Sequence, residues 1–360
     1  MVPTGKAGKR FVLEKTRLLN ALVKGCPLER IALKAFMVME HLLLQRVPKS
    51  KAADNAKHLD RRLDLWEKGR IKDLMEEAAT LQERLEGKSS KQEKHHAETA
   101  RLFAKFVFEG RIHHALKFMD NKNGQGILPL TEETWTELKR KHPEGQKVDE
   151  SLMIKGTPPE VNHIVFAELD GGMIQKAALD MQGSAGVSGG DAQHWRRLCC
   201  SFRQASAGLC EALAAFARRL CTEQIDPVVL EAFVCNRSLP LDKSPGLRPI
   251  GIGELIRRIV GKAVLRLLKK DISIAAGATQ LCAGQEAGAE AIIHAMLEEY
   301  SEDTTEGILL VDADNGFNRL NRNMALHNIR FICPAFSTIL LNCYRTPTKL
   351  YVQGGRVLYS

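Results

Sequence analysis

The sequence predicts a predominantly helical α+β fold, and three observations support this. Residues from about 10 to 120 carry apolar side chains at helical spacing with charges on the other faces, as at Leu59, Leu63 and Trp66. Short apolar runs beside Pro and Gly turns, at 239–250 and 350–359, indicate hairpins. A chain of 360 residues that is 44% hydrophobic can also bury a substantial core. We therefore expect many helices and a small, incomplete antiparallel sheet.

Breaks in the helical pattern divide the chain into three expected parts. Gly124, Gly126 and Pro129 interrupt the first set of helices, and Pro143 and Gly156 belong to a stretch with the composition of a loop. We expect a basic helical N-terminal region at 1–141, a linker or surface loop at 142–167, and a further region at 168–360.

Positive charge is concentrated in the first part of the chain. Residues 1–150 hold 30 Lys and Arg against 22 Asp and Glu, whereas residues 151–360 hold 22 against 21. This favours a polyanionic partner, although a solvated basic face is the ordinary alternative. The start of the chain lacks the apolar segment of a signal peptide, and no run approaches the roughly 20 apolar residues of a membrane span. We expect an intracellular protein, nuclear or cytoplasmic, with no membrane contact.

The nine cysteines form no C-x-x-C pair, and several lie on apolar helical faces. This pattern favours buried free thiols over a zinc site.

A glycine-rich stretch, Gly183–Asp191, separates an expected helix at 168–182 from one that begins near Ala192. Such a loop either cradles phosphate at the start of the next helix or is a plain turn. Another helix is expected at 206–221.

The stretch from Leu239 to Ile250 reads as two short strands around a Pro-Gly turn, with Lys243 and Arg248 flanking that turn. In the helix expected next, at 254–270, one face is apolar and the other is strongly positive. The positive face includes Arg257, Arg258 and Lys262.

The C-terminal part contains the main candidate for chemistry. Ile308–Val311 reads as a buried strand that ends in Asp312, followed by a helix that Asn321 caps, another helix from Pro334, and a hairpin at 350–359. A carboxylate at a strand end is costly to bury without a cation, so Asp312 and Asp314 form a divalent-metal hypothesis. A turn with a helix cap is the alternative.

A glycosyltransferase-type Asp-x-Asp motif, Asp312 to Asp314, is a second enzymatic alternative. Such an enzyme should have a nucleotide-binding βα pattern upstream, whereas the upstream half here is helical and basic.

Several segments, in order, resemble reverse transcriptases of the non-LTR retrotransposon type over roughly residues 183–360. Gly190-Asp191 is similar to the turn that opens the fingers, here without its proline. The second fingers motif resembles Leu239–Lys243 followed by Arg248-Pro249-Ile250 and Arg257-Arg258, and this is the most specific match. Residues 280–291 are similar to the segment that leads into the palm, and Val311–Asn318 looks like the first palm motif.

The resemblance implies a right-hand polymerase with partial fingers and palm, and phosphoryl transfer assisted by two Mg²⁺ ions. It makes Asp312 the catalytic first metal ligand, assisted by the carbonyl of Ala313. Lys243 and Arg248 would bind the triphosphate, since a guanidinium pairs bidentately with phosphate oxygens. Phe317 would lie under the sugar and select deoxynucleotides. Arg257, Arg258 and Lys262 would contact nucleic acid, and the implied partners are an RNA template, a DNA primer and deoxynucleotides.

The family continues with an aromatic-x-Asp-Asp hairpin that supplies further metal ligands, and this sequence contains no such segment. We therefore expect a fragment of an RNA-directed DNA polymerase that is inactive as this chain alone. The alternative is a nucleic-acid-binding or interaction protein that retains only the polymerase scaffold.

Overall fold

A computed structural model describes most of the chain. The described residues are 2–25, 29–48, 50–86, 95–120, 126–243, 245–278, 280–281, 286–302, 304, 306–313 and 315–360. Within these ranges, no helix has the length and apolar character needed to cross a membrane.

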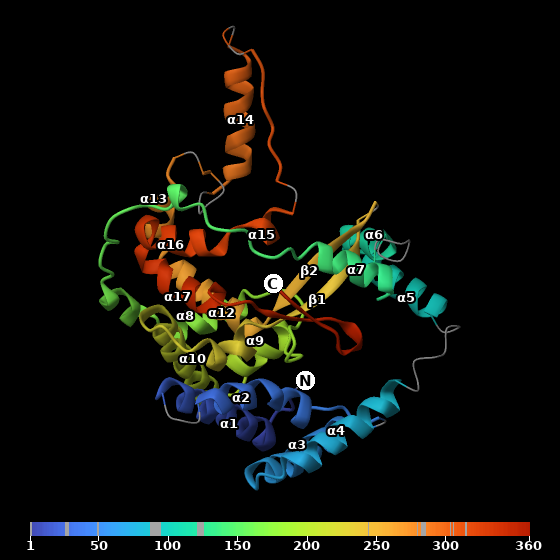
Figure 1. The fold of residues 1–360 in the computed structure, drawn as a ribbon. Coiled ribbons are helices and arrows are strands. Elements are labelled where there is room, and N and C mark those ends of the chain that lie inside the picture. Colours follow the sequence, from blue (N-terminus) through green and yellow to red (C-terminus); the bar gives the residue numbers. More distant parts are fainter. Residues whose placement is uncertain are drawn as a thin grey trace.

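The described residues form many helices and one four-stranded sheet, which confirms a predominantly helical α+β fold (Figure 1). The N-terminal helices are α1 (Lys6–Val23), α2 (Glu29–Leu43), α3 (Ala52–Glu67), α4 (Ile71–Glu86), α5 (His95–Phe108), α6 (Ile112–Asp120) and α7 (Glu132–Arg140). The middle helices are α8 (Gly171–Leu179), α9 (Ala192–Cys200), α10 (Gln204–Thr222), α11 (Pro227–Val234), α12 (Leu255–Leu267) and α13 (Lys269–Ala276). The C-terminal helices are α14 (Gly288–Tyr300), α15 (Gly316–Arg319), α16 (Arg322–Ile332) and α17 (Pro334–Tyr344).

Local sequence signals set several helix starts. The Asp191 carboxylate accepts a hydrogen bond from the backbone N–H of His194 at 2.8 Å and caps α9. Asn321 caps α16 in the same way, as expected from the sequence. The helices α11 and α17 each have proline in the first turn, where a missing N–H costs no hydrogen bond.

The main hydrophobic core is organised around α10. This helix packs against α1 on one side and against α8, α9 and α17 on the others. Phe11 and Leu19 of α1 share one buried cluster with Leu213 and Phe216 of α10 and Ile259 of α12. The core thus crosses the boundary that the sequence placed near residue 142.

The sheet has the strand order β2-β1-β3-β4. Its strands are β1 (Asn236–Asp242), β2 (Leu247–Gly253), β3 (Lys349–Tyr351) and β4 (Val357–Tyr359). The hairpins β1–β2 and β3–β4 are antiparallel, as expected, whereas β1 pairs with β3 in parallel. The expectation of a purely antiparallel sheet is therefore wrong, because the two hairpins join side by side through β1 and β3.

A second, smaller cluster ties α7 to this sheet. Leu138 of α7 is fully buried beside Leu247, Leu350 and Leu358, with Trp135 partly buried against them. The helix α7 therefore covers part of both hairpins, although the sequence assigned it to the N-terminal region.

The expected buried strand Ile308–Val311 is not a strand. The segment 306–313 is extended and unpaired, and Leu309, Leu310 and Val311 are 86%, 80% and 84% exposed. In Figure 1, α14 stands out from the other helices and this segment returns beside it. The prediction failed because an apolar run signals burial only when a neighbouring strand covers it.

The cysteines are free thiols where the structure describes them, which confirms that expectation. Six are buried and Cys200 is half-buried, while Cys26 and Cys282 lie outside the described residues. Burial raises the pKa of the Cys221 and Cys235 thiols to about 12.

Candidate nucleotide and nucleic-acid site

The β1–β2 hairpin presents two cations at its turn. Asp242 pairs with Leu247 and Leu241 pairs with Arg248, and the backbone N–H of Lys243 closes the turn by donating to the carbonyl of Gly246 at 3.1 Å. Gly246 has φ +97°, a conformation that favours glycine. The side chains of Lys243 and Arg248 are exposed, and neither makes a hydrogen bond or ion pair with a described residue. Both are therefore available to an anionic ligand.

Asp312 and Ala313 lie at the end of the exposed extended segment, just before α15. Both residues are exposed, and the aromatic ring of Phe317 on α15 is fully exposed. Asp314 lies outside the described residues. Among the described residues, no group of three His, Cys, Asp or Glu side chains is placed to hold a metal ion. The carboxylate of Asp312 is thus a single candidate ligand here.

The helix α7 connects the Asp312 segment to the hairpin. The carbonyl oxygen of Lys141, at the C-terminal end of α7, accepts hydrogen bonds from Asn315 Nδ2 at 2.8 Å and Asn318 Nδ2 at 3.0 Å. Because α7 also packs on β2, one helix holds both the strand that carries Arg248 and the residues next to Asp312.

Part of the expected linker 142–167 packs along α16 and is held there by hydrogen bonds. Asn328 accepts from the N–H of Ile154 at 2.9 Å and donates to the carbonyl of Leu152 at 3.1 Å. His327 Nε2 lies 2.8 Å from the carbonyl oxygen of Ile154. These contacts hold the segment against α16, the second helix after the Asp312 segment.

The cations expected to bind nucleic acid on α12 make contacts within the protein. Arg257 Nη1 donates to the carbonyl of Val234 at 3.1 Å, Nη2 donates to the Tyr344 hydroxyl at 3.2 Å, and the guanidinium lies 5.3 Å from the Tyr344 ring centroid. A hydrogen-bonded and stacked guanidinium is held in place, so Arg257 has little freedom to follow a nucleic-acid backbone.

Arg258 and Lys262 hold the loop that follows α8. Arg258 donates to the carbonyls of Gln182 and Ser184 at 3.4 and 2.5 Å, and Lys262 Nζ donates to the carbonyl of Asp180 at 3.1 Å. Burial lowers the pKa of Arg258, and the charge of Glu254 opposes that shift. All three α12 cations therefore donate hydrogen bonds to neutral oxygens, and none of them forms an ion pair with a described carboxylate.

The glycine-rich loop is clamped by Glu254, the residue before α12. Its carboxylate accepts from the backbone N–H of Ser188 at 2.8 Å and from the Ser188 hydroxyl at 2.6 Å. His41 Nε2 lies 2.7 Å from the Val187 carbonyl. A Cβ at Gly186 would lie 2.9 Å from the Glu254 Cα. The backbone of the loop therefore packs closely against the start of α12. The Ser188 N–H, which a bound phosphate would need, already donates to Glu254.

A buried polar cluster lies beside this loop, and it was not predicted from the sequence. Lys15 Nζ donates to Glu40 Oε1 at 2.8 Å and to the Phe36 carbonyl at 2.9 Å, and it lies 4.0 Å from the Phe36 ring centroid. His194 Nε2 lies 3.1 Å from the same carboxylate oxygen. Burial alone raises the pKa of Glu40, but the charges of Lys15 and His194, with their hydrogen bonds, hold it at about 2.

The sequence did contain a signal for this cluster. Lys15 lies four residues after Phe11 and four before Leu19 on the apolar stripe of α1, and Glu40 follows Phe36 by four residues on the stripe of α2. A charge in the middle of an apolar stripe predicts a buried pair.

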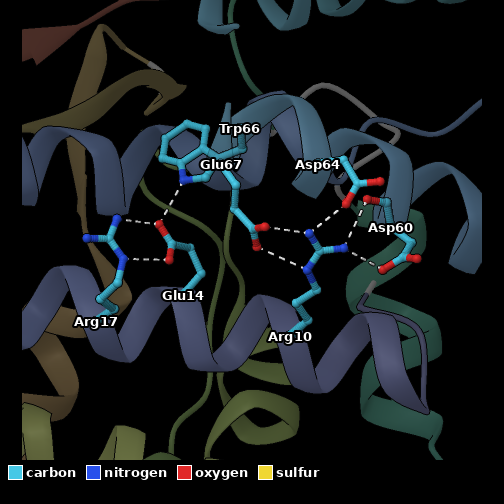
Figure 2. A network of polar contacts seen from close by, with 7 residues as sticks. All are labelled: Arg10, Glu14, Arg17, Asp60, Asp64, Trp66 and Glu67. Carbon is cyan, nitrogen blue, oxygen red and sulfur yellow. Dashed lines mark hydrogen bonds and ion pairs between the residues drawn. The ribbon is translucent and has the colours of Figure 1, made fainter. Parts of the chain in front are cut away.

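Part of the basic charge of the N-terminal region is neutralised within it (Figure 2). Arg10 of α1 donates to Asp60 at 2.8 Å, to Asp64 at 2.6 Å and bidentately to Glu67, three acids on one face of α3. Figure 2 also shows that the Glu14 carboxylate accepts hydrogen bonds from Arg17 and from Trp66 Nε1, the latter at 2.9 Å. These carboxylates and arginines fasten α3 to α1.

The exposed positive charge is carried mostly by lysine. Seven exposed lysines of α1, α3, α4 and the adjoining turns make no ion pair with a described residue: Lys6, Lys9, Lys24, Lys51, Lys57, Lys68 and Lys72.

No family model, curated protein or solved structure matches this chain.

The described residues before β1 hold no strand beyond an isolated bridge at Ile127, so the upstream βα unit that a glycosyltransferase would need is not found there.

Proposed function

We propose that this chain is the fingers and the first part of the palm of a reverse transcriptase of the non-LTR retrotransposon type. In this proposal it binds a deoxynucleoside triphosphate together with Mg²⁺. The ordered motifs between residues 183 and 318 support the proposal, since they follow the order of the family along the chain.

The observation that carries the proposal is the shared attachment to α7. This helix packs on β2, which carries Arg248, and its terminal carbonyl binds Asn315 and Asn318, which flank Phe317 and follow Asp312. Segments about 65 residues apart in sequence are thereby tied to one support. A common support is compatible with a polymerase, in which the triphosphate must meet fingers cations and a palm carboxylate together.

Each proposed residue has a separate chemical role. Lys243 and Arg248 neutralise the triphosphate, and their lack of described protein partners leaves their donors available for it. Asp312, with the carbonyl of Ala313, binds the first Mg²⁺ through the oxygen ligands that this ion prefers. Phe317 lies under the sugar and leaves no room for a 2′-hydroxyl.

The chain by itself is proposed to bind nucleotide without polymerising it. The sequence contains one palm carboxylate motif and no aromatic-x-Asp-Asp segment. Two-metal phosphoryl transfer requires two ions about 3.5–4 Å apart, which a single carboxylate does not assemble. Deoxynucleotide incorporation by the purified chain on a primed RNA template should therefore remain at background, and template-dependent incorporation would contradict this.

Equilibrium binding of Mg²⁺-dATP tests the nucleotide site. The double variant Lys243→Ala/Arg248→Ala should bind at least tenfold more weakly than wild type, because it loses both triphosphate contacts. Lys269→Ala/Lys270→Ala is the matched control, since it removes two exposed cations from α13 and should bind as wild type does. If both double variants lose the same affinity for Mg²⁺-dATP, the loss comes from the change in net charge, and the proposed site is refuted.

Nucleic-acid binding without nucleotide binding is a second candidate function, and the exposed unpaired lysines of the N-terminal helices favour it. Lysine ammonium groups bind phosphates as point charges with little sequence preference. RNA affinity should then fall steeply as the salt concentration rises. The slope of log affinity against log salt concentration should become smaller when Lys6, Lys9 and Lys24 are replaced by Gln. Affinity that does not change with salt would exclude this function.

A further inference from the structure

A groove of about 420 Å³ lies between α12 and α17. Val260 and Leu265 of α12 line it together with Phe336 and Leu340 of α17, and Phe233 of α11 also contributes. Volumes of about 300–1,000 Å³ with mainly apolar walls are typical of small-molecule sites. The groove therefore has the size and lining to hold the apolar body of a ligand.

A glycine in the middle of α12 keeps the groove open. Gly261 lines it, and a Cβ built at this position would meet no atom within 4 Å. Glycine inside a helix costs roughly 0.5–1 kcal/mol relative to alanine. Packing within the protein does not require a glycine here, since a side chain would fit. The empty space above Gly261 is thus available to a ligand.

The groove is flanked by cations whose charges no carboxylate contacts directly. Arg257, Arg258 and Lys262 line it, and each donates to neutral carbonyl or hydroxyl oxygens. The charge of Glu254 acts on Arg258 and that of Lys262 acts on Asp180, and both carboxylates already accept hydrogen bonds elsewhere. The groove therefore lies in a positive field.

Tyr344 supplies a donor beside one of these cations. Its hydroxyl oxygen accepts from Arg257 Nη2 at 3.2 Å, so its own O–H points away from that bond and can donate. A guanidinium with an adjacent phenol O–H is a suitable pair for a carboxylate, which accepts from both.

We propose that this groove binds a small amphipathic carboxylate, with the apolar chain over Gly261 and Leu265 and the carboxylate at Arg257 and Tyr344. The site is separate from the proposed nucleotide site and does not rest on it. Neutral molecules of the same shape lack the charge attraction, and cationic ones are repelled by three like charges.

Calorimetric titration of the full chain with decanoate, kept below its micelle-forming concentration, tests this proposal. Decanoate should bind at least tenfold more tightly than decanol, and decylammonium should not bind. Gly261→Leu should weaken decanoate binding at least tenfold by filling the groove. The matched control is Gly208→Leu, which places the same side chain at another helical glycine with open space, on α10, and should leave binding unchanged.

Leu265→Glu provides a second variant, because this side chain is 46% exposed and its replacement is compatible with folding. It should abolish decanoate binding by placing a negative charge at the groove. Arg257→Gln should remove the preference for decanoate over decanol. Undiminished decanoate binding in both Gly261→Leu and Leu265→Glu, or equal affinity of wild type for decanoate and decanol, would overturn the proposal.

Discussion

Replacing Glu40 by glutamine should destabilise the protein strongly, because it leaves the Lys15 ammonium buried without a countercharge. The side chain of Lys15 is fully buried and that of Glu40 is 5% exposed, with 2.8 Å between the charged atoms. Glutamine at this position keeps the shape and an acceptor oxygen, so the substitution removes mainly the charge.

Two arguments give the magnitude. The pKa of Glu40 is held at about 2, against a reference value of 4.5. At about 1.4 kcal/mol per unit, this difference corresponds to about 3–4 kcal/mol of folding free energy. Breaking a buried ion pair by removing one partner costs about 3–5 kcal/mol. We therefore expect the free energy of unfolding to fall by about 3 kcal/mol.

Urea unfolding followed by circular dichroism measures this loss. Glu132→Gln is the control, because Glu132 forms an ion pair with Arg356 while its side chain is 75% exposed, and its loss should change the free energy of unfolding much less. The double variant Lys15→Met/Glu40→Leu should recover most of the stability, since it removes both charges. A loss below about 1 kcal/mol for Glu40→Gln would refute the buried pair.

The same pair predicts how stability depends on pH. The folded pKa of Glu40 is lower than its unfolded value, so its contribution is present above the unfolded pKa and disappears as pH falls toward the folded one. The difference in unfolding free energy between wild type and Glu40→Gln should be constant near neutral pH and shrink between about pH 5 and pH 2. A difference that stays constant through that range would contradict the assignment.

Three further predictions concern other parts of the molecule. Arg10→Met should lower the free energy of unfolding by about 1–3 kcal/mol, because it leaves three α3 carboxylates without their shared cation; a change below about 0.5 kcal/mol in urea unfolding would contradict this. Gly186→Ala should cost about 1–3 kcal/mol by overpacking against Glu254, whereas Gly208→Ala should cost nothing. We expect wild type to bind dATP about tenfold more tightly than ATP, and Phe317→Ala should reduce this preference to less than threefold while retaining its affinity for dATP. An unchanged preference would show that Phe317 does not lie under the sugar.

Local signals in the sequence predicted much of the fold. The Pro-Gly turn predicted the β1–β2 hairpin, Gly354-Gly355 predicted the β3–β4 hairpin, and Asn321 predicted the start of α16. These features depend on neighbouring residues alone, which is why they could be predicted.

Features that depend on distant contacts could not be predicted. The exposure of Ile308–Val311 depends on whether another strand covers it, and the parallel pairing of β1 with β3 joins hairpins about 100 residues apart. The positive face of α12 was visible in the sequence, but its hydrogen bonds to the carbonyls of Val234 and Asp180 were not.

Binding of Mn²⁺, as a substitute for Mg²⁺, with dATP tests the central claim most directly. Electron paramagnetic resonance measures the free ion in the presence of wild type and of Asp312→Asn. The proposed site predicts that wild type binds Mn²⁺-dATP and that Asp312→Asn binds it at least tenfold more weakly, because the substitution removes the one carboxylate assigned to the metal. Equal binding by both proteins, or none by wild type, would contradict the assignment of a polymerase nucleotide site to this chain.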